Sequence, residues 1–410
     1  MKSEGFKELD LPKRMLPRLA LIATISASLV VGGAALGPVW AVPSYPSWAE
    51  VQAAKRNVAK KKAIIKKLEA VIQEEAKKAD ALGKVALIKG EAFNQAQDAV
   101  DVETAKVNAL QQQVTSAQSK ADSAKAQLGR IAAQMYRDGA AGTSLSMFLN
   151  AGKADDLLYK LGTQNQIAGQ SDTIYRRSIA TAKYAQSLAD DLSVAQAQLA
   201  SKAAVAKSLF AEAKSAADAQ QAVVDSNERL NKTFYAQLAV LQNTSADLER
   251  QRAEGLAAEA RQNAGTSKPI APELYSVGDA NETKVGIAID FAKQQLGEAY
   301  VLGGMGPSVW DCSGITKAAY AAAGLYIGTH SATNQFNTMA AGRKLVPLDQ
   351  WQPGDLLWYS QSSSFNGDKY HVVIYLGGNM MLEAPNPART VRIVPVRYGE
   401  LFPYAGRPSA

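Results

Sequence analysis

Every seventh residue from Val51 to Leu128 is apolar, and this repeat constrains the fold more than any other feature of the 410-residue chain. The stretch from Trp48 to Tyr136 contains no proline and is rich in alanine, lysine, glutamine and glutamate, which favour helix. A sustained seven-residue repeat predicts a helix that supercoils against a partner helix. A helix of about 80 residues would make a rod of roughly 120 Å.

A second alanine-rich stretch follows, from about Ile174 to Gln262. Its own seven-residue column is apolar apart from Gln220 and Asn227, which either fix the register or mark a local loosening. Two long helices in one chain most simply form an antiparallel hairpin, although alanine content does not exclude pairing between chains. We therefore predict a coiled-coil hairpin over residues 48–262.

The segment 137–173 between these helices combines glycines with an apolar cluster of leucine, methionine and phenylalanine. It predicts one or two short helices at the tip of the hairpin. The apolar side chains either close a small core of the tip or form a docking site for a partner. After the hairpin, residues 263–284 are rich in Gly, Ser, Pro, Asn and Thr and predict a linker.

The remaining residues, 285–410, predict an α+β domain that is long enough to have a core of its own. Helices are expected over 285–296 and 311–323. Strands are expected over 356–359, 371–376, 380–383 and 391–396, separated by Gly, Pro and Asn turns.

The start of the chain has the pattern of a targeting segment. Basic residues precede an apolar run over 19–36, and Val39 and Ala41 place small side chains where a signal peptidase inspects them. Residues 1–41 therefore predict a signal peptide and an exported protein. No charged residue stands between Arg18 and Glu50, so an uncleaved N-terminal anchor is the alternative.

The net charge of +7 suits nucleic acid, an anionic membrane or the anionic polymers of a bacterial wall. Export argues against nucleic acid, and so does the lack of a basic stretch interleaved with aromatic residues. One cysteine and two widely separated histidines offer no zinc cluster, so we expect no metal and no other cofactor.

The single cysteine, Cys312, cannot form an internal disulfide, and it opens a predicted helix after a Gly-rich loop. A helix start lowers a thiol pKa, and its free N–H groups can receive an oxyanion. His371 begins an apolar strand, and a turn over 377–379 would bring Glu383 beside it. These three residues predict a nucleophile, a base and a carboxylate that orients the base. The other histidine, His330, is a rival base in a loop.

Four segments carry a family resemblance: Tyr300–Gly304, Asp311–Gly314, Pro353–Leu356 and His371–Gly377. In order and spacing they resemble the NlpC family of cell-wall cysteine peptidases over about residues 285–408. The resemblance implies a papain-like α+β fold that hydrolyses the peptide stems of peptidoglycan, often at the bond from γ-D-glutamyl to the diamino acid. A glutamate as third residue resembles the actinobacterial Rip-type endopeptidases.

The resemblance also implies four substrate-binding residues. Tyr300 matches a tyrosine that lines the site. Asp311 and Ser313 match positions that contact the stem peptide, and Ser331 lies in a segment similar to a pocket wall. The polar insert over 361–369 departs from the family pattern and leaves the exact bond open.

The hairpin carries a second resemblance. Residues 133–139, together with the apolar run 145–158, resemble the hairpin region of secreted division hydrolases of the PcsB and Rip type. That region is similar to a handle docked by the FtsEX membrane complex. The resemblance therefore implies an FtsEX-type partner at the tip.

Together these patterns predict an exported peptidoglycan endopeptidase in the wall of a Gram-positive, actinobacterial cell, acting in wall remodelling or division. Because uncontrolled wall cleavage is lethal, we expect a state in which the rod, the linker or a partner covers Cys312. Two alternatives stay open. One is a coiled-coil scaffold with a silent domain, and the other is an acyltransferase or amidase with the same three residues.

Overall fold

The computed structural model describes residues 46–137, 154–263 and 268–410. The predicted signal segment 1–41 and residues 138–153 of the predicted tip lie outside the described residues. Within the described ranges, no helix has both the length and the apolar character that crossing a membrane requires.

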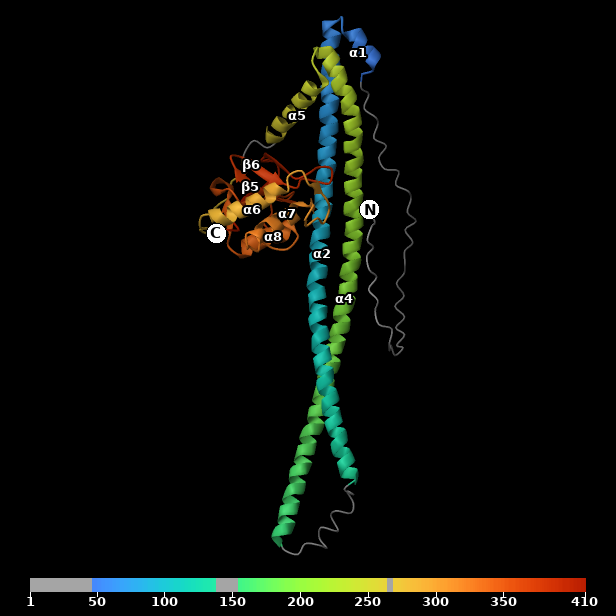
Figure 1. The fold of residues 1–410 in the computed structure, drawn as a ribbon, viewed down its shortest axis with the longest axis vertical. Helices are drawn as coiled ribbons and strands as arrows, with labels where there is room; N and C mark the ends of the chain where they lie inside the picture. The colour runs from blue at the N-terminus through green and yellow to red at the C-terminus, as the bar shows by residue number, and fades with distance from the viewer. Residues whose placement is uncertain (1–45, 138–153, 264–267) are drawn as a thin grey trace. The chain divides into compact units, whose positions relative to one another are not determined.

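Two long helices, α2 (Val58–Arg137) and α4 (Ala154–Gln242), run side by side as the predicted hairpin (Figure 1). The prediction of separate short tip helices is wrong for residues 154–173, because they are the first turns of α4. A further helix, α5 (Ala246–Asn263), follows after a turn in which Asn243 has a φ of 62°. The prediction of one continuous helix to Gln262 is therefore wrong, because asparagine accepts this left-handed conformation and ends α4.

The hairpin is antiparallel, as the ion pairs that cross it show. Lys89 pairs with Glu212, and Lys202, which precedes Glu212 on α4, pairs with Glu103, farther along α2, each at 2.7 Å. Near the short first helix, α1 (Trp48–Ala54), the hairpin core contains large buried side chains. Farther along α2 the buried core of the hairpin contains mainly small side chains, Ala117, Ala121 and Ala185, beside Leu188.

The two polar interruptions of the α4 column have different partners. The amide of Asn227 donates to the carbonyl of Glu75 at 2.9 Å, and this bond fixes the register of the hairpin. The amide of Gln220 donates to the side-chain oxygen of Asn386, in the C-terminal domain, at 2.7 Å. One interruption therefore holds the two long helices together, and the other joins α4 to a different part of the protein.

The C-terminal part is the predicted α+β domain. Its helices are α6 (Glu282–Gln294), α7 (Cys312–Ala322), α8 (Ala332–Ala341) and the short η1 (Leu348–Gln350). Its strands are β1 (Ala299–Tyr300), β2 (Val309–Trp310), β3 (Leu345–Pro347), β4 (Leu356–Tyr359), β5 (His371–Gly377), β6 (Met380–Glu383), β7 (Arg392–Pro395) and β8 (Leu401–Gly406).

Six of these strands form one antiparallel sheet in the order β3-β8-β4-β5-β6-β7, and β1 and β2 form a separate parallel pair. Alternate residues of β4 enter two different apolar clusters: Trp358 packs with Phe336 of α8, and Leu357 packs on the opposite face. Among the described members of these two clusters, Leu87 alone comes from the hairpin. The domain therefore has a core of its own.

The predicted linker contacts this domain. The hydroxyl of Tyr404 donates to the carbonyl of Pro272, and the N–H of Leu345 donates to the hydroxyl of Tyr275, both at 3.1 Å. Because these contacts join the segment to β8 and β3, residues 268–410 are the natural unit for experiments on the domain.

Candidate active site

The start of α7 fixes the position of Cys312. Asp311 is the N-cap of this helix: its carboxylate accepts from the N–H of Gly314 at 2.7 Å and from the N–H of Gly303 at 3.2 Å. A Cβ on Gly314 would lie 2.0 Å from the carbonyl oxygen of Gly304, so only glycine permits this close approach. The preceding loop and the helix start therefore hold the thiol in one place.

Strands β5 and β6 bring His371 and Glu383 together, as the sequence predicted. Nε2 of His371 lies 2.8 Å from Oε2 of Glu383, and both residues are fully buried. The other ring nitrogen, Nδ1, is buried and has no hydrogen-bond partner. Cys312 and Val372, the residue after His371 on β5, are buried in the same apolar cluster. The thiol therefore lies beside the strand start that carries the unpartnered Nδ1.

Two arginines that sequence analysis missed hold Glu383. Arg392 donates to Oε1 at 3.0 and 2.8 Å, and Arg397 donates to both carboxylate oxygens at 2.8 Å. Burial by itself raises the pKa of Glu383, but the charge of Arg397 and the bonds it receives hold that pKa well below its usual range. A carboxylate that stays ionised can orient the imidazole of His371. Strands β6 and β7 pair so that Arg392 lies opposite Glu383, and a predicted pairing of these two strands would have indicated the contact of Arg392 with Glu383.

The thiol and the imidazole are both held in their neutral forms. Burial lowers the pKa of His371, and the nearby Glu383 opposes this shift. Burial raises the pKa of Cys312 well above its ordinary value, and the carboxylates of Asp311 and Glu91 raise it further. The prediction that the helix start lowers the thiol pKa is therefore wrong for this arrangement, because desolvation and two acidic neighbours outweigh the helix dipole.

Three of the four predicted substrate-binding residues lie next to Cys312: Asp311 and Ser313 flank it in the chain, and Tyr300 packs in the same apolar cluster. Tyr300 is buried, and its pKa is raised by burial and by the neighbouring Cys312. The hydroxyl of Ser313 donates to Asp311 at 3.1 Å. Ser331 stands at the start of α8, where its hydroxyl caps the helix.

The rival base, His330, is engaged elsewhere. Its Nε2 lies 2.8 Å from Oδ1 of Asp311, the same oxygen that receives the N–H of Gly314. His330 therefore belongs to the network at the start of α7, whereas His371 pairs with Glu383 on the sheet and has a buried ring nitrogen without a hydrogen-bond partner.

Helix α2 of the hairpin also contacts the site. Its Asn94 donates to Oδ2 of Asp311 at 3.1 Å and to the hydroxyl of Ser313 at 3.3 Å. Leu87, two turns earlier on α2, packs in the same apolar cluster as Cys312. The sequence analysis expected the rod, the linker or a partner to cover Cys312. These contacts come from α2, which is part of the predicted rod.

The insert before β5 is anchored by a buried lysine. Lys369 donates to the carbonyl of Phe365 at 3.1 Å and to that of Gly367, and its ammonium lies over the rings of Phe336 and Phe402 at 4.3 and 4.1 Å. Burial lowers the pKa of Lys369 to about 8. The insert is therefore tied to the core beside α8.

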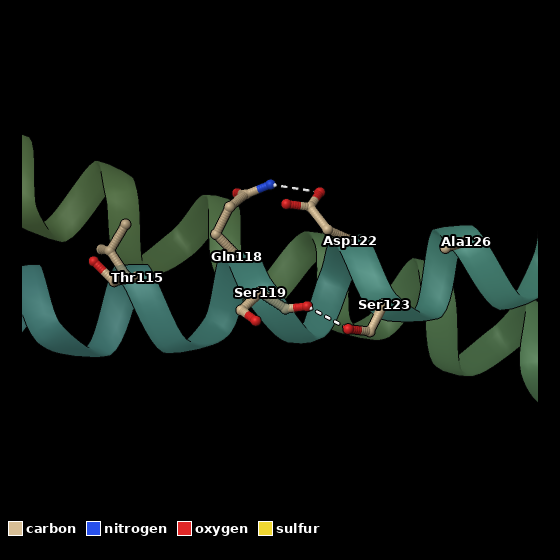
Figure 2. Close-up of a pocket in the computed structure, with 7 residues that line it drawn as sticks. Thr115, Gln118, Ser119, Asp122, Ser123 and Ala126 are labelled. Carbon is tan, nitrogen blue, oxygen red and sulfur yellow. Dashed lines mark hydrogen bonds between the residues drawn. The ribbon is translucent and has the colours of Figure 1, made fainter.

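A shallow hollow along α2 lies apart from this site (Figure 2). Its side chains bond within the helix: Gln118 donates to Asp122 at 3.1 Å, and Ser123 donates to the carbonyl of Ser119 at 2.8 Å. It contains none of the predicted site residues. In the described part of the chain, no group of three or more His, Cys, Asp or Glu side chains is placed to hold a metal ion.

A thiol at a helix start, an imidazole on a sheet and a buried carboxylate define a papain-like centre. A profile of the NlpC/P60 family matches residues 297–401. The peptidoglycan endopeptidase RipB of Mycobacterium tuberculosis is 32% identical over 183 residues, which cover 40% of this chain and 70% of RipB. The chain belongs to the NlpC/P60 family.

Other relatives match over a smaller share of their length. The peptidoglycan endopeptidase RipA of Mycobacterium tuberculosis is 30% identical over 191 residues, which are 43% of this chain and 35% of RipA. The chain therefore spans only about a third of that relative. The solved structure of RipB is 28% identical, with a TM-score of 0.28, and the match covers 39% of this chain and 86% of that one.

Proposed function

We propose that this protein is an exported cysteine endopeptidase that cleaves stem peptides of peptidoglycan. The observation that carries the proposal is the thiol of Cys312 beside the strand start at His371, whose Nδ1 has no partner while Nε2 is held by Glu383. The names of RipA and RipB support a peptidoglycan substrate.

The proposed bond joins γ-D-glutamyl to the diamino acid. A relative from Bacillus cereus, 31% identical over 119 residues, is a gamma-D-glutamyl-L-lysine dipeptidyl-peptidase, and its name supports this choice. Tyr300, Asp311, Ser313 and Ser331 are the proposed contacts with the stem.

In the proposed reaction, Nδ1 of His371 takes the proton of the Cys312 thiol, and the sulfur attacks the amide carbonyl carbon. Free N–H groups at the start of α7 stabilise the oxyanion. The imidazolium, stabilised by Glu383, then gives its proton to the leaving amine as the C–N bond breaks. Water attacks the remaining thioester, which releases the acid and restores the thiol.

We also propose that the hairpin regulates this activity in wall remodelling or division. The contacts of Asn94 with Asp311 and Ser313 support a state in which α2 restrains the site. Docking of an FtsEX-type complex at the tip would relieve the restraint. The central residues of that tip, 138–153, are outside the described part of the chain.

Mass spectrometry of purified peptidoglycan tests the reaction. We expect residues 268–410 to release stem fragments that end in D-glutamate or isoglutamine, and the Cys312→Ala variant to release none. Fragments cut at another bond would refute the bond specificity. No fragments from either protein would favour the scaffold over the enzyme.

A further inference from the structure

One face of α2 contacts the C-terminal domain although the seven-residue repeat places it away from α4. Lys84, Glu91 and Asp98 are seven residues apart, on the side of the helix opposite the apolar column. Lys84 pairs with Glu400 of the C-terminal domain, and Asp98 accepts from the hydroxyl of Thr329. Glu91 lies between them on the same face. The repeat alone would leave all three in solvent.

Two glycines on the neighbouring positions of α2 allow the domain to approach. A Cβ on Gly90 would lie 3.0 Å from Cδ1 of Leu302, and one on Gly83 would lie 3.0 Å from Nδ2 of Asn386, and both of these residues belong to the C-terminal domain. Glycine weakens a helix interior, so a packing reason is expected for both. A Cβ on Gly129, farther along the same helix, would meet no neighbouring atom within 4 Å, so this glycine serves as a comparison.

The carboxylate of Glu91 is bound at the start of α8. It accepts from the hydroxyl of Ser331 at 2.7 Å and from the N–H groups of Ala332 and Thr333 at 2.9 and 3.0 Å. The amide of Gln95 donates to it at 3.1 Å. Glu91 is 4% exposed, and these four partners are all neutral. A helix start binds an anion in this way, through oriented N–H groups.

We propose that Glu91 locks α2 over Cys312. Its carboxylate acts as an intramolecular ligand that binds the N-terminus of α8. The inference rests on the proposed function of Cys312 as nucleophile. In the locked form the carboxylate of Glu91 accepts the hydrogen bond of Ser331, which is one of the proposed substrate contacts. The charge of Glu91 also adds to the rise in the pKa of the Cys312 thiol. If Glu91 leaves the start of α8, Ser331 becomes free to bind substrate. Solvent then also reaches the Cys312 thiol, and the thiol becomes more reactive.

Alkylation of the full chain by iodoacetamide tests the lock, because Cys312 is the single thiol. We expect the Glu91→Ala variant to react about tenfold faster than the wild type or more, since the bonds of a charged acceptor are lost. Alanine favours helix, so α2 itself is retained. Glu74→Ala, at an exposed position of the same helix, should react at the wild-type rate. A wild-type rate for Glu91→Ala would overturn the lock.

A wedge at the glycines provides a second, independent test. Gly90→Leu should also speed alkylation, because the added side chain meets Leu302, whereas Gly129→Leu should leave the rate unchanged. Release of stem fragments is measured on the same variants. Faster alkylation without fragments would support the lock and refute the proposed hydrolysis. Unchanged alkylation in both Glu91→Ala and Gly90→Leu would refute the lock whatever the hydrolysis.

Discussion

Both histidines of this chain pair with a carboxylate at 2.8 Å, but the two pairs are built differently. Glu383 is fully buried and is held by two arginines, and the histidine it pairs with keeps one ring nitrogen without a partner. Asp311 instead caps α7, binds the preceding loop, pairs with His330 and receives Asn94 from the hairpin.

The comparison shows that a short histidine–carboxylate distance does not define a base. Apart from the two arginines, Glu383 contacts one titratable side chain, that of His371, so its charge can orient and stabilise this imidazole. Asp311 divides its oxygens among structural contacts, so its pair with His330 belongs to the framework around the thiol.

Replacing each histidine by alanine in residues 268–410 should separate the two pairs. We expect His371→Ala to lower the rate of stem-fragment release by about 10³-fold, because general base and acid catalysis are lost. His330→Ala should lower it by less than about tenfold, because the residue supports the loop. Mass spectrometry of fragments over time measures both rates. A larger loss for His330→Ala would reverse the assignment of the base.

Removing one carboxylate charge should destabilise the two regions unequally. Glu383→Gln leaves Arg392 and Arg397 without their buried counter-charge and should cost about 3–5 kcal/mol of unfolding free energy at pH 7. Asp311→Asn keeps a helix cap and should cost about 1 kcal/mol. Urea unfolding of residues 268–410 measures both. Similar losses of unfolding free energy in the two variants would show that the charge of Glu383 between its two arginines stabilises the domain no more than the helix cap of Asp311 does.

The same cluster gives a dependence on pH with a definite sign. The pKa of Glu383 is lower in the folded protein than in the unfolded chain, where it is about 4.3. Ionised Glu383 therefore adds to the free energy of unfolding above about pH 4.3, and this contribution is lost as the pH falls through the pKa of the folded protein. The difference in unfolding free energy between wild type and Glu383→Gln should therefore shrink below about pH 4. A difference that stays constant to pH 2 would contradict this account.

Acidification should strengthen the docking of α2 on the C-terminal domain, whereas it weakens the contribution of Glu383. Burial raises the pKa of Glu91 from 4.5 to about 6, so the docked form takes up a proton more readily than an undocked one. Lowering the pH from 7 to 5 should favour docking by about 1 kcal/mol. The ratio of alkylation rates, residues 268–410 over the full chain, measures docking, because it compares the uncovered thiol with the thiol covered by α2 at the same pH. That ratio should rise on acidification, and in Glu91→Gln it should not.

Local patterns in the sequence determined much of the fold. The seven-residue repeat predicted the hairpin, because burial against a partner helix recurs at a fixed interval along one helix. Strands β4, β5 and β6 were predicted because each is a short apolar run bounded by turn residues. Cys312 and His371 were predicted as site residues because a lone thiol and two histidines restrict the choice, and Glu383 because the turn over 377–379 brings it beside His371.

Only the tertiary structure decided what meets each surface. Strand β8 enters the sheet between β3 and β4, and Arg397 reaches Glu383, through contacts that no local pattern specifies. The repeat assigned the outer face of α2 to solvent, since a helical pattern records which side faces the partner helix and nothing about the opposite side. Glu91 is buried on that face because it contacts a domain more than two hundred residues farther along the chain. The charge that Glu91 brings to this contact adds to the rise that burial causes in the pKa of Cys312.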